Sequence, residues 1–197
     1  MILPRDFYLR PVQIVARDIL GKQLIHLTGS QRAGGIIVEA EAYDGEQDLA
    51  CHARVGRTER NKVMYFQGGH AYVHFTYGMH WMLNCVTGDM GYPSAVLIRS
   101  IVPNEGLEFI KNQRPNSPEK LWCNGPAKLT KALAITGGLN GSDLCDPKGT
   151  LFIENGVEIS ERMVKITPRV GIQSTPEPWL SKPWRFFADL SKDKNLI

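Results

Sequence analysis

Two carboxylates and a tyrosine share one apolar segment, and they are the first side chains whose spacing could support catalysis. Glu39, Glu41 and Tyr43 occupy alternate positions of the segment Gly35–Tyr43. A carboxylate placed in this way can orient a water molecule and accept its proton. A salt bridge at the edge of a strand would explain the same residues without any chemistry. The residue types alone leave both interpretations open.

A second group consists of flat side chains with polar tips. Its members are Tyr43, His52, Tyr72, His74 and Tyr77. Such rings stack on the faces of nucleobases and form hydrogen bonds with their edges. Ordinary packing in a core or an interface accounts for them equally well, so the sequence does not decide between the two.

The histidines also raise the question of a metal site, because neutral imidazole and thiolate are good zinc ligands. His52, His70, His74 and His80 accompany Cys51, but Cys51 and His52 are adjacent and the motif HExxH is absent. This spacing is unlike that of zinc enzymes. We therefore expect no catalytic metal and no cofactor.

Basic residues gather in one glycine-containing segment. Arg54, Arg57, Arg60 and Lys62 surround Gly56, and Glu59 is the only acid among them. This clustering indicates a loop that contacts phosphates. The alternative is a solvated loop with scattered ion pairs. The net charge of +3 is weaker evidence, since many proteins with a small basic excess never bind nucleic acid.

Hydrophobic periodicity predicts the elements that must position these residues. A helix is expected over Pro11–Leu20, before Gly21, and Lys22–Thr28 and Gly35–Tyr43 are expected to form a hairpin. In the second strand, alternation predicts two faces. One face carries Ile37, Glu39, Glu41 and Tyr43, and the other, expected to face the core, carries Ile36, Val38, Ala40 and Ala42.

The rest of the chain predicts more strands than helices. Ala71–Tyr77 and His80–Val86 form a second hairpin with Tyr77 at or near its tip, and residues 45–69 form a long loop. Leu97 and Arg99 share a face of a strand over Ser94–Ile101. The remaining expected elements are helices over Glu105–Arg114 and Pro126–Ile135 and strands over Leu151–Glu154, Met163–Thr167 and Trp184–Ala188.

These elements show no βαβ rhythm, no internal repeat and no linker. We therefore predict an α+β fold: one mixed domain over residues 1–197, with a curved, mostly antiparallel sheet, flanking helices and a protruding hairpin.

The cysteines bear on the cellular compartment. Cys51, Cys85, Cys123 and Cys145 stand far apart without a CxxC pair, which predicts reduced thiols. The sequence has no apolar run of membrane-spanning length and no signal-peptide pattern. We expect a soluble cytoplasmic monomer, associated with the nucleoid if the source is bacterial.

Several segments together resemble one known family. They are VEAEAYDGEQDLACHARVGRTERN, YVHFTYGMHWMLN, NGPAKLTKALAI, RVGI and KPWRF, and they occur in this order between about Asp6 and Ala188. The chain resembles the alkyladenine (3-methyladenine) DNA glycosylases. The resemblance implies that the partner is double-stranded DNA containing alkylated or deaminated purines such as 3-methyladenine, 7-methylguanine, hypoxanthine or ethenoadenine. It implies hydrolysis of the N-glycosidic bond after the nucleotide is flipped out of the duplex.

The resemblance also assigns roles to individual residues. Glu41 matches the general base that holds the attacking water, and Arg99 and the backbone carbonyl of Val170 match the other ligands of that water. Tyr43 and His52 match residues that stack on and hydrogen-bond to the flipped base. Tyr77 matches the side chain that fills the space vacated in the minor groove, and Asn84 matches a residue that clashes with the amino group of undamaged guanine.

One position departs from the family pattern. His74 aligns with a position that is usually tyrosine and that completes the stack around the base. An imidazole covers less area and can become cationic near neutral pH. The sequence does not determine how this substitution affects the substrate range and the pH dependence.

Two other functions are compatible with the same residues. One is a glycosylase with lyase activity, in which Lys128 attacks C1′ and forms a Schiff base, although its place near a helix start suits a phosphate contact equally well. The other is a lesion or minor-groove binder without catalysis, which would need the basic loop and Tyr77 but not Glu41.

Overall fold

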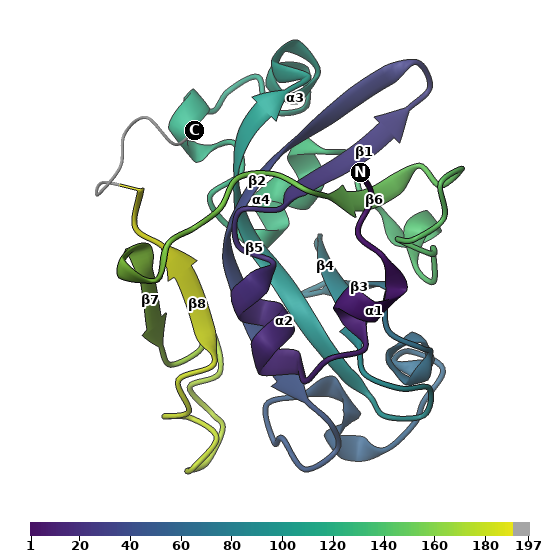
Figure 1. Cartoon of the computed structure of the whole chain (residues 1–197), viewed down its shortest axis with the longest axis vertical. Helices are drawn as coiled ribbons and strands as arrows, with labels where there is room; N and C mark the ends of the chain where they lie inside the picture. The colour runs from purple at the N-terminus through teal and green to yellow at the C-terminus, as the bar shows by residue number, and fades with distance from the viewer. Residues whose placement is uncertain (191–197) are drawn as a thin grey trace.

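The structure is a computed structural model that describes residues 1–190, so residues 191–197 of the expected domain lie outside the described part (Figure 1). Four short α-helices accompany eight strands in the described residues. The α-helices are α1 (Arg5–Tyr8), α2 (Val12–Asp18), α3 (Leu107–Gln113) and α4 (Pro126–Ala132). The strands are β1 (Gln23–Thr28), β2 (Gln31–Asp44), β3 (Ala71–Thr76), β4 (His80–Thr87), β5 (Ser94–Glu105), β6 (Leu151–Glu154), β7 (Val164–Thr167) and β8 (Arg185–Ala188).

The strands form one open sheet around β2. The order along the main path is β3-β4-β5-β2-β1-β6, and β8 pairs with both β2 and β7. Strand β5 pairs with β2 from Gly34 to Asp44, while β1 and β8 pair with successive parts of the same strand. Each of these pairs is antiparallel. The predicted α+β fold with an antiparallel sheet is confirmed.

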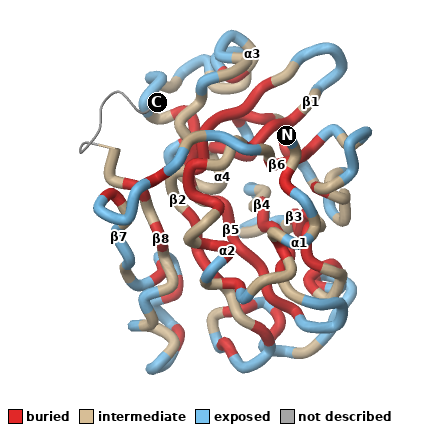
Figure 2. The backbone as a smooth tube through the Cα atoms, viewed as in Figure 1, coloured by how far each residue is buried: buried red, intermediate tan, exposed pale blue. Residues whose placement is uncertain are grey.

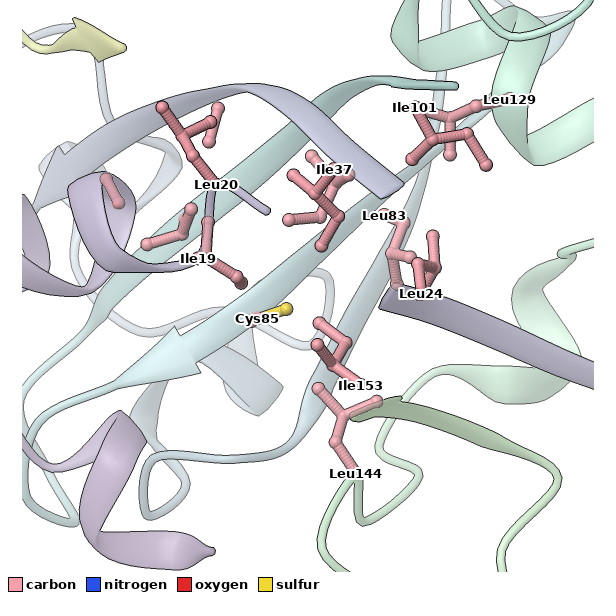
Figure 3. Close-up of a cluster of buried hydrophobic side chains, with 14 of the residues drawn as sticks. Ile19, Leu20, Leu24, Ile37, Leu83, Cys85, Ile101, Leu129, Leu144 and Ile153 are labelled. Atoms are coloured by element: carbon pink, nitrogen blue, oxygen red, sulfur yellow. The ribbon is translucent and has the colours of Figure 1, made fainter. Parts of the chain in front are cut away.

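One face of the sheet carries the main hydrophobic core. Helix α2 contacts β2 and β5, and α4 contacts β4 and β5, and Figure 1 shows α2 lying across the two long strands. In Figure 2 the buried backbone runs along these strands and α2. Ile19, directly after α2, meets Ile37 of β2, Leu83 of β4 and Leu129 of α4 in the cluster drawn in Figure 3. Burial of these side chains is the main stabilising term of the fold.

The opposite face carries a smaller cluster beneath the long loop that follows β2. Its buried members are Cys51, Ala53, Val63, Met64, Tyr72, Val86 and Ala95. The loop contains two 3₁₀ helices, His52–Val55 and Lys62–Tyr65, which supply the cluster residues from the loop side. Alternation along β3 illustrates the division, because Ala71 and Val73 belong to the main core and Tyr72 to the smaller cluster.

The alternation predicted for β2 is wrong at Ile37. This side chain lies in the main core with Ala40 and Ala42, and not on the face of Glu39 and Glu41. The reason is a pair of register shifts, between Ile37 and Glu39 and between Glu39 and Ala40, at which the regular pairing with β5 is interrupted. A bulge reverses the side-chain alternation that a regular strand would keep.

Most predicted elements are confirmed with shifts at their ends. Strand β5 continues to Glu105, which pairs with Gly34, so α3 begins at Leu107 and not at Glu105. The short helix α1 was not predicted, since its few residues show no helical period. Tyr77 follows β3 directly and occupies the turn of the β3–β4 hairpin, as predicted.

Candidate active site

Register brings four residues from four adjacent strands into one row across the sheet. Tyr72 of β3 lies opposite Asn84 of β4, Asn84 opposite Leu97 of β5, and Leu97 opposite Glu41 of β2. Directly paired residues in an antiparallel sheet project to the same face. The sheet therefore gathers on one surface residues that lie far apart in the sequence.

Glu41 is completely buried and has three hydrogen-bond donors around its carboxylate. Its Oε2 accepts hydrogen bonds from the Tyr43 hydroxyl at 2.9 Å and from Nη1 of Arg99 at 3.1 Å. Its Oε1 accepts a hydrogen bond from the Val170 backbone N–H at 2.7 Å. The carboxylate is thus held from β2, from β5 and from the segment between β7 and β8, which we call the strap (residues 168–184).

Glu39 completes an ionic network beside Glu41. Its Oε1 accepts hydrogen bonds from Nε of Arg99 at 2.9 Å and from Nε of Arg185 at 2.6 Å. Arg99 therefore bridges the two carboxylates, and Arg185 of β8 balances the second negative charge. Glu39 is thus paired with two arginines and Glu41 with one.

The protonation of Glu41 follows from this environment. Burial raises the pKa of Glu41 above its ordinary value, and the Arg99 guanidinium, the Val170 N–H and the Tyr43 hydroxyl only partly oppose this effect. A carboxylate with a raised pKa is a stronger base, provided that it is ionised at the working pH.

A cavity of about 270 Å³ opens beside these donors. Tyr43, Arg99 and Val170 all line the cavity, so Glu41 lies behind the wall that its own donors form. Its other walls include the rings of His52, Tyr72, His74 and Tyr77 together with Asn84. This volume is slightly below the range of roughly 300–1,000 Å³ that is usual for small-molecule sites.

The rings of the cavity wall are fixed by contacts with one another. Tyr72 stacks on His74 with ring centres 5.0 Å apart, and its hydroxyl lies 3.0 Å from Nδ1 of His52. Nδ2 of Asn84 donates to the backbone oxygen of Tyr72 at 3.0 Å and lies 3.3 Å from Nδ1 of His74. The predicted base-binding residues are therefore brought together, and Tyr72 joins them as a structural partner.

The environment of His74 favours the neutral form of its ring. Burial, followed by the nearby His52 and Arg60, lowers the pKa of His74 to about 3. The pKa of His52 is lowered to about 4, mainly by partial removal of its ring from water and further by Arg60 and Arg54. Both imidazoles are neutral at physiological pH, so the wall is formed by uncharged, electron-rich rings.

The hairpin tip exposes Tyr77 at the mouth of the cavity. Its side chain is 81% exposed, and its φ of 51° is in the left-handed region, which a bulky residue rarely adopts. Met79, in the same turn, is also exposed. Strain of this kind is often retained for function.

The four basic residues of the predicted loop are all exposed. Arg54 donates to the Leu49 backbone oxygen at 2.8 Å, and Arg60 donates to the Phe75 backbone oxygen at 3.1 Å. Lys62 pairs with Glu59 at 2.7 Å, and the Arg57 guanidinium lies 5.7 Å from the centre of the Tyr65 ring. Arg54 and Arg60 also line a neighbouring hollow that shares His52 and Gly171 with the ring-lined cavity.

Lys128 lies in the first turn of α4, as predicted. Its Nζ donates to the Asn124 side-chain oxygen at 2.9 Å. Pro126 of the same turn lines the cavity, whereas Lys128 does not belong to the cavity wall formed by residues 1–190.

Two further residues of the site were not predicted. Arg169 and Asp48 form an ion pair whose side chains are both fully buried, and this pair joins the strap to the loop after β2. Arg169 belongs to the segment RVGI, which drew attention only through Val170, and a single arginine in a loop ordinarily indicates a solvated side chain.

Two other expectations concern metals and membranes. His70 and His74 are four residues apart, but His70 lies beside Arg5 and Gln67, and His74 beside Asn84. Within residues 1–190, no group of three or more His, Cys, Asp or Glu side chains is arranged to hold a metal ion. In the same described part of the chain, no helix combines the length and the apolar character needed to cross a bilayer.

Comparison with known proteins yields consistent matches. Residues 6–192 match the family described as methylpurine-DNA glycosylase. A protein of Methanocella arvoryzae is 47% identical over 195 residues, covering 98% of this chain and 93% of that protein. A protein of Carboxydothermus hydrogenoformans is 45% identical over 192 residues, covering 98% and 97% of the two chains. Both relatives are named "Putative 3-methyladenine DNA glycosylase".

The matched region contains every residue of the site from Glu39 to Arg185. The class of protein is that of the DNA glycosylases, hydrolases of N-glycosyl bonds that act in base-excision repair of DNA. Within this class, the chain belongs to the methylpurine-DNA glycosylase family.

Proposed function

We propose that this protein flips an alkylated or deaminated purine out of duplex DNA, binds it in the ring-lined cavity and hydrolyses its glycosidic bond with a water activated by Glu41. The product is an abasic site, and no covalent enzyme intermediate forms. The observation that carries the proposal is the buried carboxylate of Glu41, whose three donors also line the cavity.

The hydrogen bonds of Glu41 leave one position for the water. An ionised carboxylate has about four acceptor sites, two on each oxygen. Oε2 accepts from Tyr43 and Arg99, whereas Oε1 accepts from the Val170 N–H. The second acceptor site of Oε1 can therefore accept a hydrogen bond from the attacking water and then its proton. The same negative charge would stabilise the positive charge that develops near C1′ in an oxocarbenium-like transition state.

The cavity suits the flat and often cationic bases that result from alkylation. Tyr43, Tyr72 and the neutral ring of His74 present aromatic surfaces to its interior. N3- and N7-alkylated purines carry a positive charge, which aromatic faces attract by cation–π interaction. The charge also weakens the glycosidic bond, so that these bases leave without a strong general acid.

The hairpin supports the flipping step. A base inside the duplex hides its glycosidic bond, and extruding the nucleotide costs a few kcal/mol. An exposed aromatic ring at a hairpin tip can occupy the vacated space and offset part of this cost. Tyr77 is exposed and lines the mouth of the cavity, so it can act while the base is bound inside.

The proposal is tested with purified protein and duplexes that carry hypoxanthine, ethenoadenine or 7-methylguanine. We expect release of the free base and an abasic site in an unbroken strand. Borohydride is expected to trap no protein–DNA adduct, because Lys128 lies outside the described cavity wall and donates to Asn124. A trapped adduct that disappears in Lys128→Met would instead establish a lyase. Tight lesion binding without base release would establish a binding protein.

A further prediction concerns the basic loop. Replacing Arg57 with glutamine is expected to flatten the log–log salt dependence of DNA affinity by about one unit, because each phosphate contact releases about one counterion. Lys62→Gln should have a similar effect, and Lys111→Gln is its matched control. Each of these lysines forms an ion pair with a glutamate three residues earlier, Lys62 with Glu59 and Lys111 with Glu108. Lys111→Gln should leave the slope unchanged. Unchanged slopes for Arg54, Arg57, Arg60 and Lys62 variants would assign DNA binding to another surface.

A further inference from the structure

The buried ion pair between Arg169 and Asp48 is the starting point. Nη1 and Nη2 of Arg169 donate to the two carboxylate oxygens of Asp48 at 2.5 Å and 2.9 Å, and both side chains are fully buried. Nε of Arg169 is also buried and has no hydrogen-bond partner among the described residues. Removing two charges from water costs solvation that pairing recovers only in part, so stability is a weak reason for such a pair.

The other contacts of Arg169 involve residues that adjoin Glu41, the candidate general base, either in the sequence or through a hydrogen bond. Its Nη1 donates to the Ala42 backbone oxygen at 3.0 Å, and its guanidinium lies 4.7 Å from the centre of the Tyr43 ring. Ala42 and Tyr43 directly follow Glu41 on β2, while Val170, whose N–H binds Glu41, directly follows Arg169. The Arg169 side chain therefore contacts β2 next to Glu41, and Arg169 itself belongs to the strap, whose Val170 N–H binds Glu41.

The same guanidinium also contacts two tryptophans of the strap. Nη2 of Arg169 donates to the Trp179 backbone oxygen at 3.3 Å, and the guanidinium lies 5.0 Å from the centre of the Trp184 ring. The Trp184 backbone oxygen in turn accepts from the Ala42 N–H at 2.9 Å. Arg169 thereby links both ends of the strap to β2.

Asp48 extends this arrangement to the base-binding side of the cavity. Its carboxylate accepts from the Asp44 N–H at 3.2 Å and from the Ala50 N–H at 3.0 Å. Ala50 and His52, which follow in the same loop, both line the cavity. The ion pair consequently connects the segment that holds the general base with the loop that holds the base-binding ring.

We infer that Arg169 is a positioning residue for the hydrolytic step, which holds the Val170 N–H and the Tyr43 hydroxyl in hydrogen-bonding position toward the Glu41 carboxylate. The inference rests on the proposed function, in which Glu41 activates the water. It assigns the buried pair to the geometry of the reaction and not to stability alone.

Loss of this positioning has a defined effect on proton binding. The groups that face Glu41 are Tyr43 and Glu39 from β2, Arg99 from β5 and the Val170 N–H from the strap. The Val170 N–H and the Tyr43 hydroxyl both lower the pKa of Glu41, while burial raises it. If both donors move away, the pKa of Glu41 rises further, and a smaller fraction of the enzyme carries the ionised base at a given pH.

The test is the pH dependence of single-turnover excision by Arg169→Lys, which keeps the charge but loses the planar fork. We expect excision at neutral pH to be about tenfold slower or more, with the acidic limb displaced upward by about one pH unit. Equilibrium binding of a lesion duplex should be nearly unchanged. The matched control is Arg5→Lys. Arg5 also pairs with an aspartate, Asp143, at an N–O distance of 2.5 Å, and neither residue lines the cavity. It should leave the rate and the pH profile as they are.

A second variant covers the case in which Arg169→Lys does not fold. The double variant Arg169→Gln with Asp48→Asn removes both buried charges, and it is expected to fold and to show the same displaced acidic limb. A folded variant with the wild-type pH profile would overturn the inference, as would unfolding of both variants, because the pair would then be structural. Glu41→Gln in the same series separates the two ideas, since wild-type excision by that variant would contradict the proposed function itself.

Discussion

Replacing Glu41 with glutamine is expected to reduce single-turnover excision by roughly a hundred- to ten-thousand-fold, the usual effect of losing a general base. This corresponds to about 3–5 kcal/mol of transition-state stabilisation. Glutamine keeps the size of the side chain but neither accepts a proton from water nor balances an oxocarbenium ion. Lesion binding should persist, because Glu41 lies behind the cavity wall and removing a carboxylate lessens repulsion with DNA phosphates. Quench-flow excision and equilibrium binding measure the two quantities separately.

Glu39→Gln is the matched control for this variant. Glu39 lies two residues away on the same face of β2 and shares Arg99 with Glu41, but its carboxylate is bonded to Arg99 and Arg185. We expect a much smaller loss of rate and a lower melting temperature. If Glu39→Gln is the inactive variant and Glu41→Gln excises normally, the roles of the two carboxylates are reversed. Inactivity of Glu41→Gln that accompanies unfolding would count as a structural effect.

The wild-type pH profile provides a second test of the same residue. Excision requires ionised Glu41, and burial raises its pKa, so the rate should fall as pH decreases through a midpoint above the ordinary carboxyl range. His74 and His52, with pKa values lowered to about 3 and about 4, stay neutral and should add no inflection between about pH 5.5 and 8. An inflection that disappears in His74→Phe would contradict this assignment.

Replacing Tyr77 with alanine is expected to have the second-largest effect, on the flipping equilibrium. Stacking of a base on an aromatic ring contributes about 1–3 kcal/mol, so the flipped population should fall roughly 5- to 150-fold. The measurement is the fluorescence of a base analogue placed next to the lesion, whose emission rises when its neighbour leaves the stack. The effect on excision of the flipped base itself should be small, because the groups that donate hydrogen bonds to Glu41 are Tyr43, Arg99 and the Val170 N–H.

Two variants control for side-chain loss at the hairpin. Tyr77→Phe keeps the ring and should retain most of the flipping. Met90→Ala removes another exposed apolar side chain from a turn at the opposite end of β4, and it should change neither flipping nor affinity. Equal flipping by wild type and Tyr77→Ala would make Tyr77 a packing residue and leave its left-handed backbone unexplained.

Local sequence patterns were sufficient to predict several parts of the site. The alternation of Glu41 and Tyr43 predicts a common face, and these two residues do meet because the register shifts in β2 precede Ala40 and leave Glu41 to Tyr43 regular. The exposed position of Tyr77 follows from its place beside Gly78 between two strand patterns. Both predictions depend on residues within one or two adjacent elements.

Other parts depend on contacts that no local pattern encodes. The row from Tyr72 through Asn84 and Leu97 to Glu41 is set by register, which is fixed by pairing across whole strands. The reversal at Ile37 arises from a bulge, and nothing in the apolar run around it distinguishes a bulged strand from a regular one.

The burial of Arg169 and Asp48 likewise depends on how the strap lies over β2, more than one hundred residues away in the chain from Asp48. The neutral state of His74 follows from its packing against Tyr72, His52 and Asn84, whereas its type alone indicates a residue that titrates near neutrality.

The residues around Glu39 and Glu41 are neighbours in space but are synthesised at different times. Glu39, Glu41 and Tyr43 are synthesised early and Arg99 later, but Val170 and Arg185 emerge only after all of them. Until the strap and β8 have been made, Glu41 lacks its backbone donor and Glu39 lacks one of its two arginines. The set of donors around the two carboxylates is therefore complete only after the chain has been synthesised as far as Arg185.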